Sequence, residues 1–289
     1  RATLTPESVA IWAAVLARRE ERAPEEMVSE LLGAADPSVR AAAVQILARH
    51  PDTIALPRRL ALLDDPSSLV RSRAVESLRD AKDDRRVNEA VVERLNDASS
   101  RVRRSALEWL EGSTVDLRTI EGRLEDADST VRAAAVRVAG RLGGADAVAK
   151  LVDRLSDREV IVAQAASDQL ATQADTTLAD TLIGLLQDGS DQVVRLSARS
   201  LGLLKSADAI EPLQRLAEHR SDMVRAAAYE AIGQIGQPGA VPWLLETVAK
   251  ESGYPRAAIN ESLGRLKDSQ ALEHLMADCH YPDKKSKGL

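Results

Sequence analysis

Hydrophobic and polar residues recur along most of the chain with a period of about 30 residues. When the copies are aligned, one position serves as a marker and falls at Arg40, Arg71, Arg103, Arg132, Ala163, Arg195, Arg225 and Arg256. Successive markers lie 31, 32, 29, 31, 32, 30 and 31 residues apart. Self-similarity at a fixed spacing of roughly 20 to 50 residues is typical of stacked-repeat proteins. The pattern therefore predicts eight structural repeats.

Within each copy, apolar residues follow helical spacing twice. Around the marker they stand at offsets −1, +3, +6 and +7, which trace one face of an α-helix. Offset +3 is alanine in seven copies, as at Ala43 and Ala228, where a neighbouring backbone must come close. A second periodic segment precedes the marker, as in residues 147–157. Each copy therefore predicts a helix, a short acidic turn and a second helix.

The turns carry aspartates at the predicted start of the second helix. A carboxylate at this position can accept hydrogen bonds from the free N–H groups of the first helical turn. The residues placed to do so are Asp36, Asp128, Asp191 and Asp222. Strand signals are absent, so we predict an all-α fold: a right-handed α-solenoid of about eight helical-hairpin repeats.

The two ends of the chain differ from the repeats. In residues 1–22 an apolar face that includes Trp12 predicts a capping helix, because the terminal units of solenoids must be covered. Residues 23–280 form the predicted solenoid of eight pairs, which ends in a half-repeat at 269–280. Residues 281–289 are expected to be a flexible tail.

Composition limits the interior that these helices can form. Phenylalanine is absent and aromatic residues make up 2% of the chain, so alanine, valine, leucine and isoleucine must fill the core. Such residues suit many thin helix-helix contacts. The formal net charge of −6 disfavours nucleic-acid binding, which depends on clustered cations.

Three copies carry a motif that points to a family. Residues 36–43 read DPSVRAAA, residues 128–135 read DSTVRAAA and residues 222–228 read DMVRAAA. Over residues 23–280 the sequence resembles the HEAT-repeat family, and especially its short phycobilisome-lyase-type HEAT-like repeats. The copy with Ala163 departs from this motif, as does the eighth, where Pro255 replaces the valine.

The resemblance implies a structural ladder in which turn aspartates and second-helix arginines link successive repeats. It implies this role for Asp36 with Arg40, Asp128 with Arg132 and Asp191 with Arg195. The other members of the implied ladder are Arg71, Arg103 and Arg225.

Candidate catalytic and metal-binding groups do not converge in the sequence. The four histidines are scattered and lack metal-ligand spacing: His50, His219, His274 and His280. The pair Cys279–His280 lacks the first cysteine of a haem attachment motif, because Met276 stands there. The glycines of residues 140–144 lack the strand and the Lys-Ser/Thr ending of a phosphate-binding loop, and Gly143 fits a left-handed helix end. We therefore expect no enzyme activity, cofactor or metal.

The position five residues beyond the marker suggests a binding surface. It lies off the apolar face of the second helix and is acidic in five of eight copies: Glu76, Glu108, Asp168, Glu230 and Glu261. Second helices line the concave side of a HEAT-like stack, so these carboxylates would form an acidic stripe there. The alternative is an ordinary solvated helix face. Tyr229 could add an aromatic contact to such a groove, or it could pack between repeats.

These observations favour a non-catalytic scaffold or adaptor, expected to be a domain of a larger protein or complex. Its partner would be another protein, held through a basic segment on the concave second-helix face. A tetrapyrrole (bilin) lyase or chaperone subunit is the alternative that the resemblance suggests, and nucleic-acid binding is less favoured. No apolar run is long enough to span a bilayer, so a soluble chain is expected. The compartment and the oligomeric state stay open, with the cytoplasm slightly favoured.

Overall fold

The computed structural model describes residue 8 and residues 24–49, 54–173 and 177–280, with side chains as far as residue 276. Every regular element in these segments is helical and none is a strand, which confirms the predicted all-α fold. The predicted capping helix at 1–22 and tail at 281–289 lie outside the described segments. Contacts within the chain define two units, residues 1–142 and 143–289.

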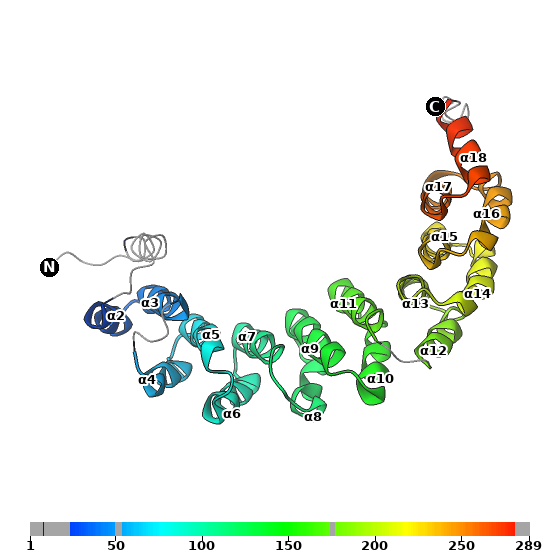
Figure 1. Ribbon diagram of the computed structural model, residues 1–289. Coiled ribbons are helices and arrows are strands. Elements are labelled where there is room, and N and C mark those ends of the chain that lie inside the picture. Colours follow the sequence, from blue (N-terminus) through cyan, green and yellow to red (C-terminus); the bar gives the residue numbers. More distant parts are fainter. Residues whose placement is uncertain (1–7, 9–23, 50–53, 174–176, 281–289) are drawn as a thin grey trace. The chain divides into compact units, whose positions relative to one another are not determined.

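The first unit contains four helical pairs (Figure 1). The first helices of the pairs are α2 (Glu25–Leu32), α4 (Leu56–Ala61), α6 (Arg85–Glu93) and α8 (Leu117–Ile120). The second helices are α3 (Pro37–Arg49), α5 (Ser68–Ser77), α7 (Ser100–Leu110) and α9 (Ser129–Leu142). Each second helix packs against the next, so α3, α5, α7 and α9 form one continuous row.

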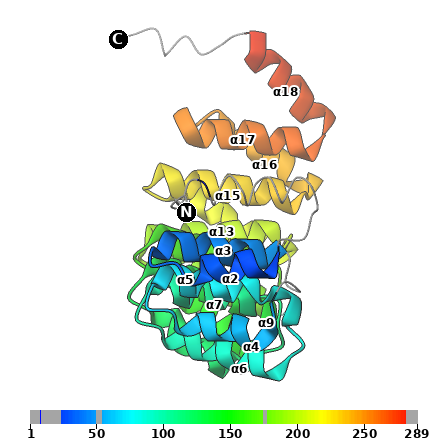
Figure 2. The ribbon, with the colours of Figure 1, turned by 90° about the vertical axis from the view of Figure 1, so that its left-hand side faces the viewer.

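The second unit repeats this arrangement. Its first helices are α10 (Ala145–Arg154), α12 (Leu178–Leu185), α14 (Ile210–Arg215) and α16 (Val241–Val248). Its second helices are α11 (Val160–Leu170), α13 (Asp191–Leu203), α15 (Asp222–Ile235) and α17 (Gly253–Leu266). Helix α18 (Ser269–His280) packs on α17 and α16 and is the last helix of the described residues. Figure 2 shows α15 and α17 lying side by side along the stack.

The core consists of the small and branched residues that the repeat places between helices. The residue at offset −1 is buried in every copy, as is the residue at offset +3. Burial of one such valine contributes roughly 1.5 to 3 kcal/mol. A single pair cannot bury these residues alone, so stability comes from stacking neighbours.

Several first helices tighten into a short 3-10 helix before the turn. These segments are η2 (Leu62–Asp64), η4 (Arg94–Asn96), η5 (Glu121–Glu125) and η7 (Leu216–Glu218). Each buries one leucine, which anchors the end of the first helix in the core. The residue that follows each 3-10 helix is thereby fixed beside the start of the second helix, namely Asp65, Asp97, Asp126 and His219.

Glycine is required where two second helices approach most closely. A Cβ atom at Gly202 would lie 2.8 Å from the Cα of Ala231, and one at Gly233 would lie 2.7 Å from the Cα of Ser262. Alanine does not fit in either place without a backbone shift. Gly143 has φ = +65°, which confirms the predicted left-handed helix end.

Candidate functional site

Three marker arginines in the first unit bind an aspartate of the following helical pair. The pairs are Arg40–Asp65, Arg71–Asp97 and Arg103–Asp126. In each pair the arginine Nε and Nη2 donate to the two carboxylate oxygens at 2.7–2.8 Å. The arginine Nη1 donates to the backbone carbonyl six residues before it, and the carboxylate accepts the N–H two residues after it. We call this set of contacts the arginine ladder, because each rung links two successive helical pairs.

The acidic partners differ from those implied by the family resemblance. Asp36 accepts the N–H of Ser38 at 2.7 Å, and Asp128 accepts the N–H and the hydroxyl of Thr130 at 2.8 and 2.6 Å. The hydrogen bond from Thr130 is the largest of several that lower the pKa of Asp128 to about 2. The Asp191 side chain forms no hydrogen bond or ion pair with the described part of the chain. The expected pairs were therefore wrong: a carboxylate at a helix start binds its own free N–H groups, and the marker arginine reaches the next pair instead.

The rungs in the first unit are ion pairs removed from solvent. The side chains of the three aspartates are 3 to 9% exposed. Burial raises the pKa of Asp97, but the hydrogen bonds from Arg71 and from the Ser99 N–H hold it below its ordinary value. The pKa values of Asp65 and Asp126 are lowered in the same way. Removal of either partner from such a pair leaves an uncompensated buried charge.

Arg132, the marker of the fourth copy, is buried and donates through Nη1 to the carbonyl of Asp126 at 2.9 Å. This contact matches the backbone contact of the other ladder arginines. It lies wholly within the first unit.

In the second unit, Arg225 forms a rung with a glutamate. Its Nε and Nη2 donate to Glu251 at 2.8 and 3.1 Å, and Nη2 also contacts Asp222 at 2.8 Å. The hydroxyl of Tyr229 donates to the same glutamate at 2.8 Å. Tyr229 is fully buried, with its ring 5.9 Å from that of Trp243, so it packs between repeats and contributes nothing to an exposed groove.

The ladder is interrupted earlier in the second unit, first at Ala163. Asp188 stands at the ladder-acid position of the next pair and accepts the N–H of Ser190 at 2.7 Å, but no arginine is opposite it. The amide of Gln192 donates to the carbonyls of Leu155 and Asp157 at 3.0 and 2.9 Å. Gln192 thereby satisfies backbone acceptors near the position where other copies place their arginine.

The next rung is also missing, because a histidine replaces its acid. Nδ1 of His219 accepts the N–H of Ser221 at 3.1 Å, and Nη1 of Arg225 donates to the His219 carbonyl at 2.9 Å. Ladder aspartates make the same two contacts, so His219 occupies their position. Imidazole has no pair of carboxylate oxygens to accept two hydrogen bonds from an arginine, and the Arg195 side chain forms no hydrogen bond or ion pair with the described residues. The sequence indicated the loss at Ala163 but not this second one.

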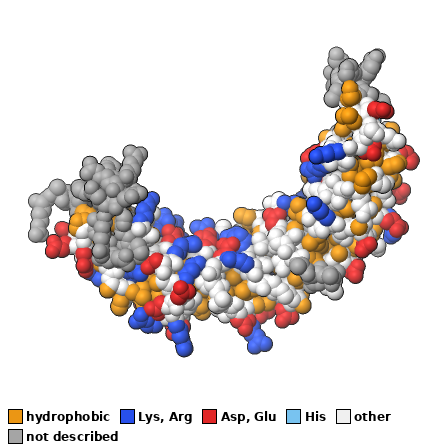
Figure 3. Space-filling view, viewed as in Figure 1, with side chains coloured by type: hydrophobic (Ala, Val, Ile, Leu, Met, Phe, Trp, Pro, Cys, Tyr) orange, Lys and Arg blue, Asp and Glu red, His pale blue; other side chains and the backbone are white. Residues whose placement is uncertain are grey.

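We define the second-helix face of each unit as the exposed side of its row of second helices. In the first unit this face carries Glu76 and Glu108, two of the predicted acidic residues. Glu76 binds Arg73 at 2.8 Å, and Glu108 lies 3.6 Å from Arg104 and 4.0 Å from Arg137. Blue and red side chains alternate over α7 and α9 in Figure 3.

The predicted carboxylates of the second unit also have partners. Asp168 binds Arg199 at 2.7 Å and Glu261 binds Arg265 at 2.6 Å. Glu230 accepts the hydroxyl of Tyr254 at 3.0 Å. The second-helix faces therefore carry charge of both signs and no single-sign acidic stripe. The prediction considered one offset of the repeat only, whereas most of the neutralising arginines stand at other offsets.

The second-helix face of the second unit is also apolar at offset −2. That position holds Ile161, Val193, Met223 and Tyr254 in the last four copies. Ile161, Met223 and Tyr254 are 55, 48 and 51% exposed. A cavity of about 310 Å³ lies among α11, α13, α15 and α17, and Arg195, Met223 and Tyr254 help to line it. Offset −2 was not among the predicted binding positions, although its apolar residues in the last four copies are visible in the sequence.

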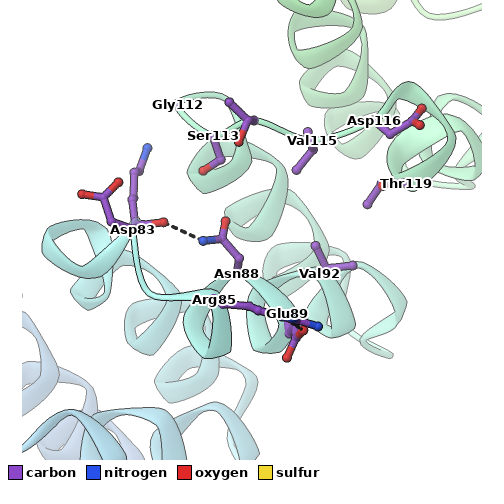
Figure 4. Close-up of a pocket in the computed structure, with 12 residues that line it drawn as sticks. Asp83, Arg85, Asn88, Glu89, Val92, Gly112, Ser113, Val115, Asp116 and Thr119 are labelled. Atoms are coloured by element: carbon purple, nitrogen blue, oxygen red, sulfur yellow. Dashed lines mark hydrogen bonds and ion pairs between the residues drawn. The ribbon is translucent and has the colours of Figure 1, made fainter.

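The first unit contains a larger cavity of about 630 Å³, between the turns that precede α6 and α8 (Figure 4). Asn88 donates to the carbonyl of Lys82 at 2.6 Å. The Lys82 Nζ lies 5.3 Å from the centre of the Trp109 ring, and burial lowers its pKa. A Cβ atom on Gly112 would collide with that Nζ. These contacts assign Lys82 a packing role against Trp109.

Among the described residues, no group of three or more His, Cys, Asp or Glu side chains is placed to hold a metal ion. His219 supports a turn, and His50 lies outside the described segments, as do the side chains of Cys279 and His280. Among the described helices, none has the length and apolar character needed to cross a membrane.

Comparisons with known proteins agree with this architecture. A family model of HEAT repeats matches residues 24–111, 117–202 and 179–264. A search of curated proteins finds no match. The structure of YibA from Escherichia coli is 17% identical, with 93% of this chain and 99% of that chain covered and a TM-score of 0.57.

Two larger solenoids also align. A chain from the structure of Kap95p with RanGDP is 15% identical, with 85% of this chain and 39% of that chain covered and a TM-score of 0.64. Importin beta is 14% identical, with 90% of this chain and 42% of that chain covered and a TM-score of 0.64. At these identities the likeness concerns the fold.

Proposed function

Because the chain belongs to the HEAT-repeat family, we propose that it is a non-catalytic scaffold or adaptor that binds another protein on its second-helix faces. The proposal depends on the difference in burial between the two sides of each second helix. One side is buried and packs against neighbouring helices. The other side carries charged residues in ion pairs and exposed apolar side chains. Such a surface suits an extended contact with a protein chain.

The paired charges on these faces bear on the kind of partner. A single-sign stripe would attract a basic segment from a distance. Here each predicted carboxylate already has a cation or a hydroxyl beside it. These contacts weaken the case for a partner that binds through a basic segment. We propose that individual charged and apolar side chains of these faces contact the partner, which favours specificity over long-range attraction.

One structural neighbour offers a parallel. The solved structure of Kap95p describes its binding to RanGDP. Its use of a helical solenoid to hold another protein is consistent with a scaffold role here.

A pair of matched charge reversals tests the proposal. The face variant carries Arg104→Glu and Arg137→Glu, which reverse the two cations around Glu108 on the second-helix face. The control carries Arg85→Glu and Arg118→Glu, on the exposed first helices of the same unit. The chain is immobilised, exposed to an extract of its native source, and the retained proteins are quantified by mass spectrometry.

We expect the face variant to retain its specific partner at least about tenfold less than wild type, a loss of about 1.4 kcal/mol. The control should retain it fully, and circular dichroism should show equal helical content in all three proteins. A partner that is lost from the control but held by the face variant would place the binding surface on the first helices and refute the proposal.

A further inference from the structure

The interrupted ladder of the second unit leaves one arginine available for a ligand. In the intact rungs, the marker arginine makes three or more hydrogen bonds to a carboxylate and a carbonyl. Arg195 makes none with the described residues, because His219 stands where the acid would be. Arg195 instead lines the cavity of about 310 Å³ on the second-helix face.

Of the two arginines that line this cavity, Arg195 is the one without a carboxylate partner among the described residues; the lining carboxylates are Asp168 and Glu230. Arg199 is bound by Asp168 at 2.7 Å, and Glu230 accepts the hydroxyl of Tyr254 at 3.0 Å. Neither of these two interactions involves Arg195, which lines the same cavity. A guanidinium binds a carboxylate through two parallel hydrogen bonds, which provides geometric specificity.

The cavity wall adds an apolar component. Met223 and Tyr254 are each about half exposed, at 48 and 51%, and both line the cavity together with Arg195. Methionine adapts its shape to different apolar groups, and tyrosine offers a rigid surface beside a polar end. An exposed apolar pair next to an unneutralised cation therefore fits a ligand with a carboxylate next to an apolar side chain.

We propose that this cavity binds a segment of a partner protein in which an acidic residue adjoins an aliphatic or aromatic residue. The acidic side chain supplies to Arg195 the carboxylate that His219 does not, and the apolar neighbour packs on Met223 and Tyr254. The proposal rests on the scaffold function proposed above and assigns it a specific binding point. The rest of the second-helix face is not required for it.

The repeat itself provides an internal test variant. His219→Asp restores the carboxylate found at this position in the intact rungs, so it should draw Arg195 back into the ladder. This variant leaves every residue of the cavity wall unchanged. Arg195→Gln removes the cation directly, and Arg215→Gln, in a surface ion pair with Glu211 on α14, serves as the control.

The experiment selects binders to the full chain from a phage-displayed library of random peptides and measures their affinities by fluorescence anisotropy. Wild type should enrich peptides in which Asp or Glu adjoins an aliphatic or aromatic residue. These peptides should bind Arg195→Gln and His219→Asp at least about tenfold more weakly, as expected for lost hydrogen bonds to a charged group. They should bind Arg215→Gln as they bind wild type. His219→Asp should also raise the urea midpoint of unfolding, which shows that the new carboxylate has recruited the arginine.

Two results would overturn the inference. One is enrichment of basic peptides, or of peptides without an acidic preference. The other is equal affinity of the acidic peptides for wild type and Arg195→Gln. Either result leaves the scaffold proposal intact, because that proposal is tested by capture of the native partner on the first unit's variants.

Discussion

Single residues decide whether successive helical pairs are linked by a buried ion pair. The arginine of each rung was visible in the sequence, because it recurs at a fixed place in the motif. Its acidic partner was not, because several acids surround each turn and sequence spacing does not reveal which one faces the arginine. Asp36 stands four residues before its marker and binds the N–H of Ser38, whereas Asp65 stands six residues before its own marker and binds Arg40 of the preceding pair.

The chain provides two acids at the same ladder position for a stability measurement, a buried one at Asp97 and an exposed one at Asp188. Asp97 binds Arg71, whereas Asp188 occupies the equivalent place without an arginine, and both accept a backbone N–H. We expect Asp97→Asn to lower the free energy of unfolding by about 3 kcal/mol, because it leaves a partly buried guanidinium unpaired. Asp188→Asn should cost less than about 1 kcal/mol. Urea unfolding followed by circular dichroism measures both.

We also expect the stability difference between wild type and Asp97→Asn to depend on pH. The pKa of Asp97 is lowered in the folded state, so its contribution is complete above the unfolded value of about 3.9 and is lost as the pH falls through the folded value. The stability difference between wild type and Asp97→Asn should therefore be largest near neutral pH and shrink below about pH 4. A difference that stayed constant to pH 3 would show that the rung contributes no charge-dependent stability.

At the scale of elements, helical periodicity predicted the pairs and the last helix well. The apolar offsets −1 and +3 are buried as expected, and α18 begins at Ser269, where the terminal half-repeat was predicted. The 3-10 ends of the first helices were not predicted, because they depend on a leucine anchored by the neighbouring helix. The boundary between the two units near Gly143 was also missed, since the repeat continues through it.

Close packing of second helices predicts opposite effects for two glycines at the same repeat position. Gly233 and Gly264 both stand eight residues beyond their markers. A Cβ atom at Gly233 would overlap Ser262, whereas one at Gly264 meets only the end of the Leu275 side chain at 3.9 Å. Gly233→Ala should lower the unfolding free energy by about 1 to 3 kcal/mol through overpacking. Gly264→Ala should be neutral or stabilising by up to about 1 kcal/mol, because alanine favours the helix. If thermal unfolding showed equal losses for the two, close packing at Gly233 would not explain its requirement.

At the scale of the whole molecule, two stacks of helical pairs offer second-helix faces with different chemistry. The first unit presents paired charges, and the second adds exposed apolar residues beside an arginine released from the ladder. From the sequence we predicted a binding surface on the row of second helices, and this stays a prediction. It did not predict the balance of charge, because that balance depends on which arginines reach across to the neighbouring helix.

Site-specific photo-crosslinking tests the central claim, that a partner protein is bound on the second-helix faces, most directly. A photoreactive amino acid is placed at Gln45 or Met223 on these faces, and at Arg85 or Glu211 on the first helices of the same two units. We expect one and the same partner to crosslink from at least one face position and from neither first-helix position. Crosslinks confined to positions 85 and 211, or equal at all four, would contradict it.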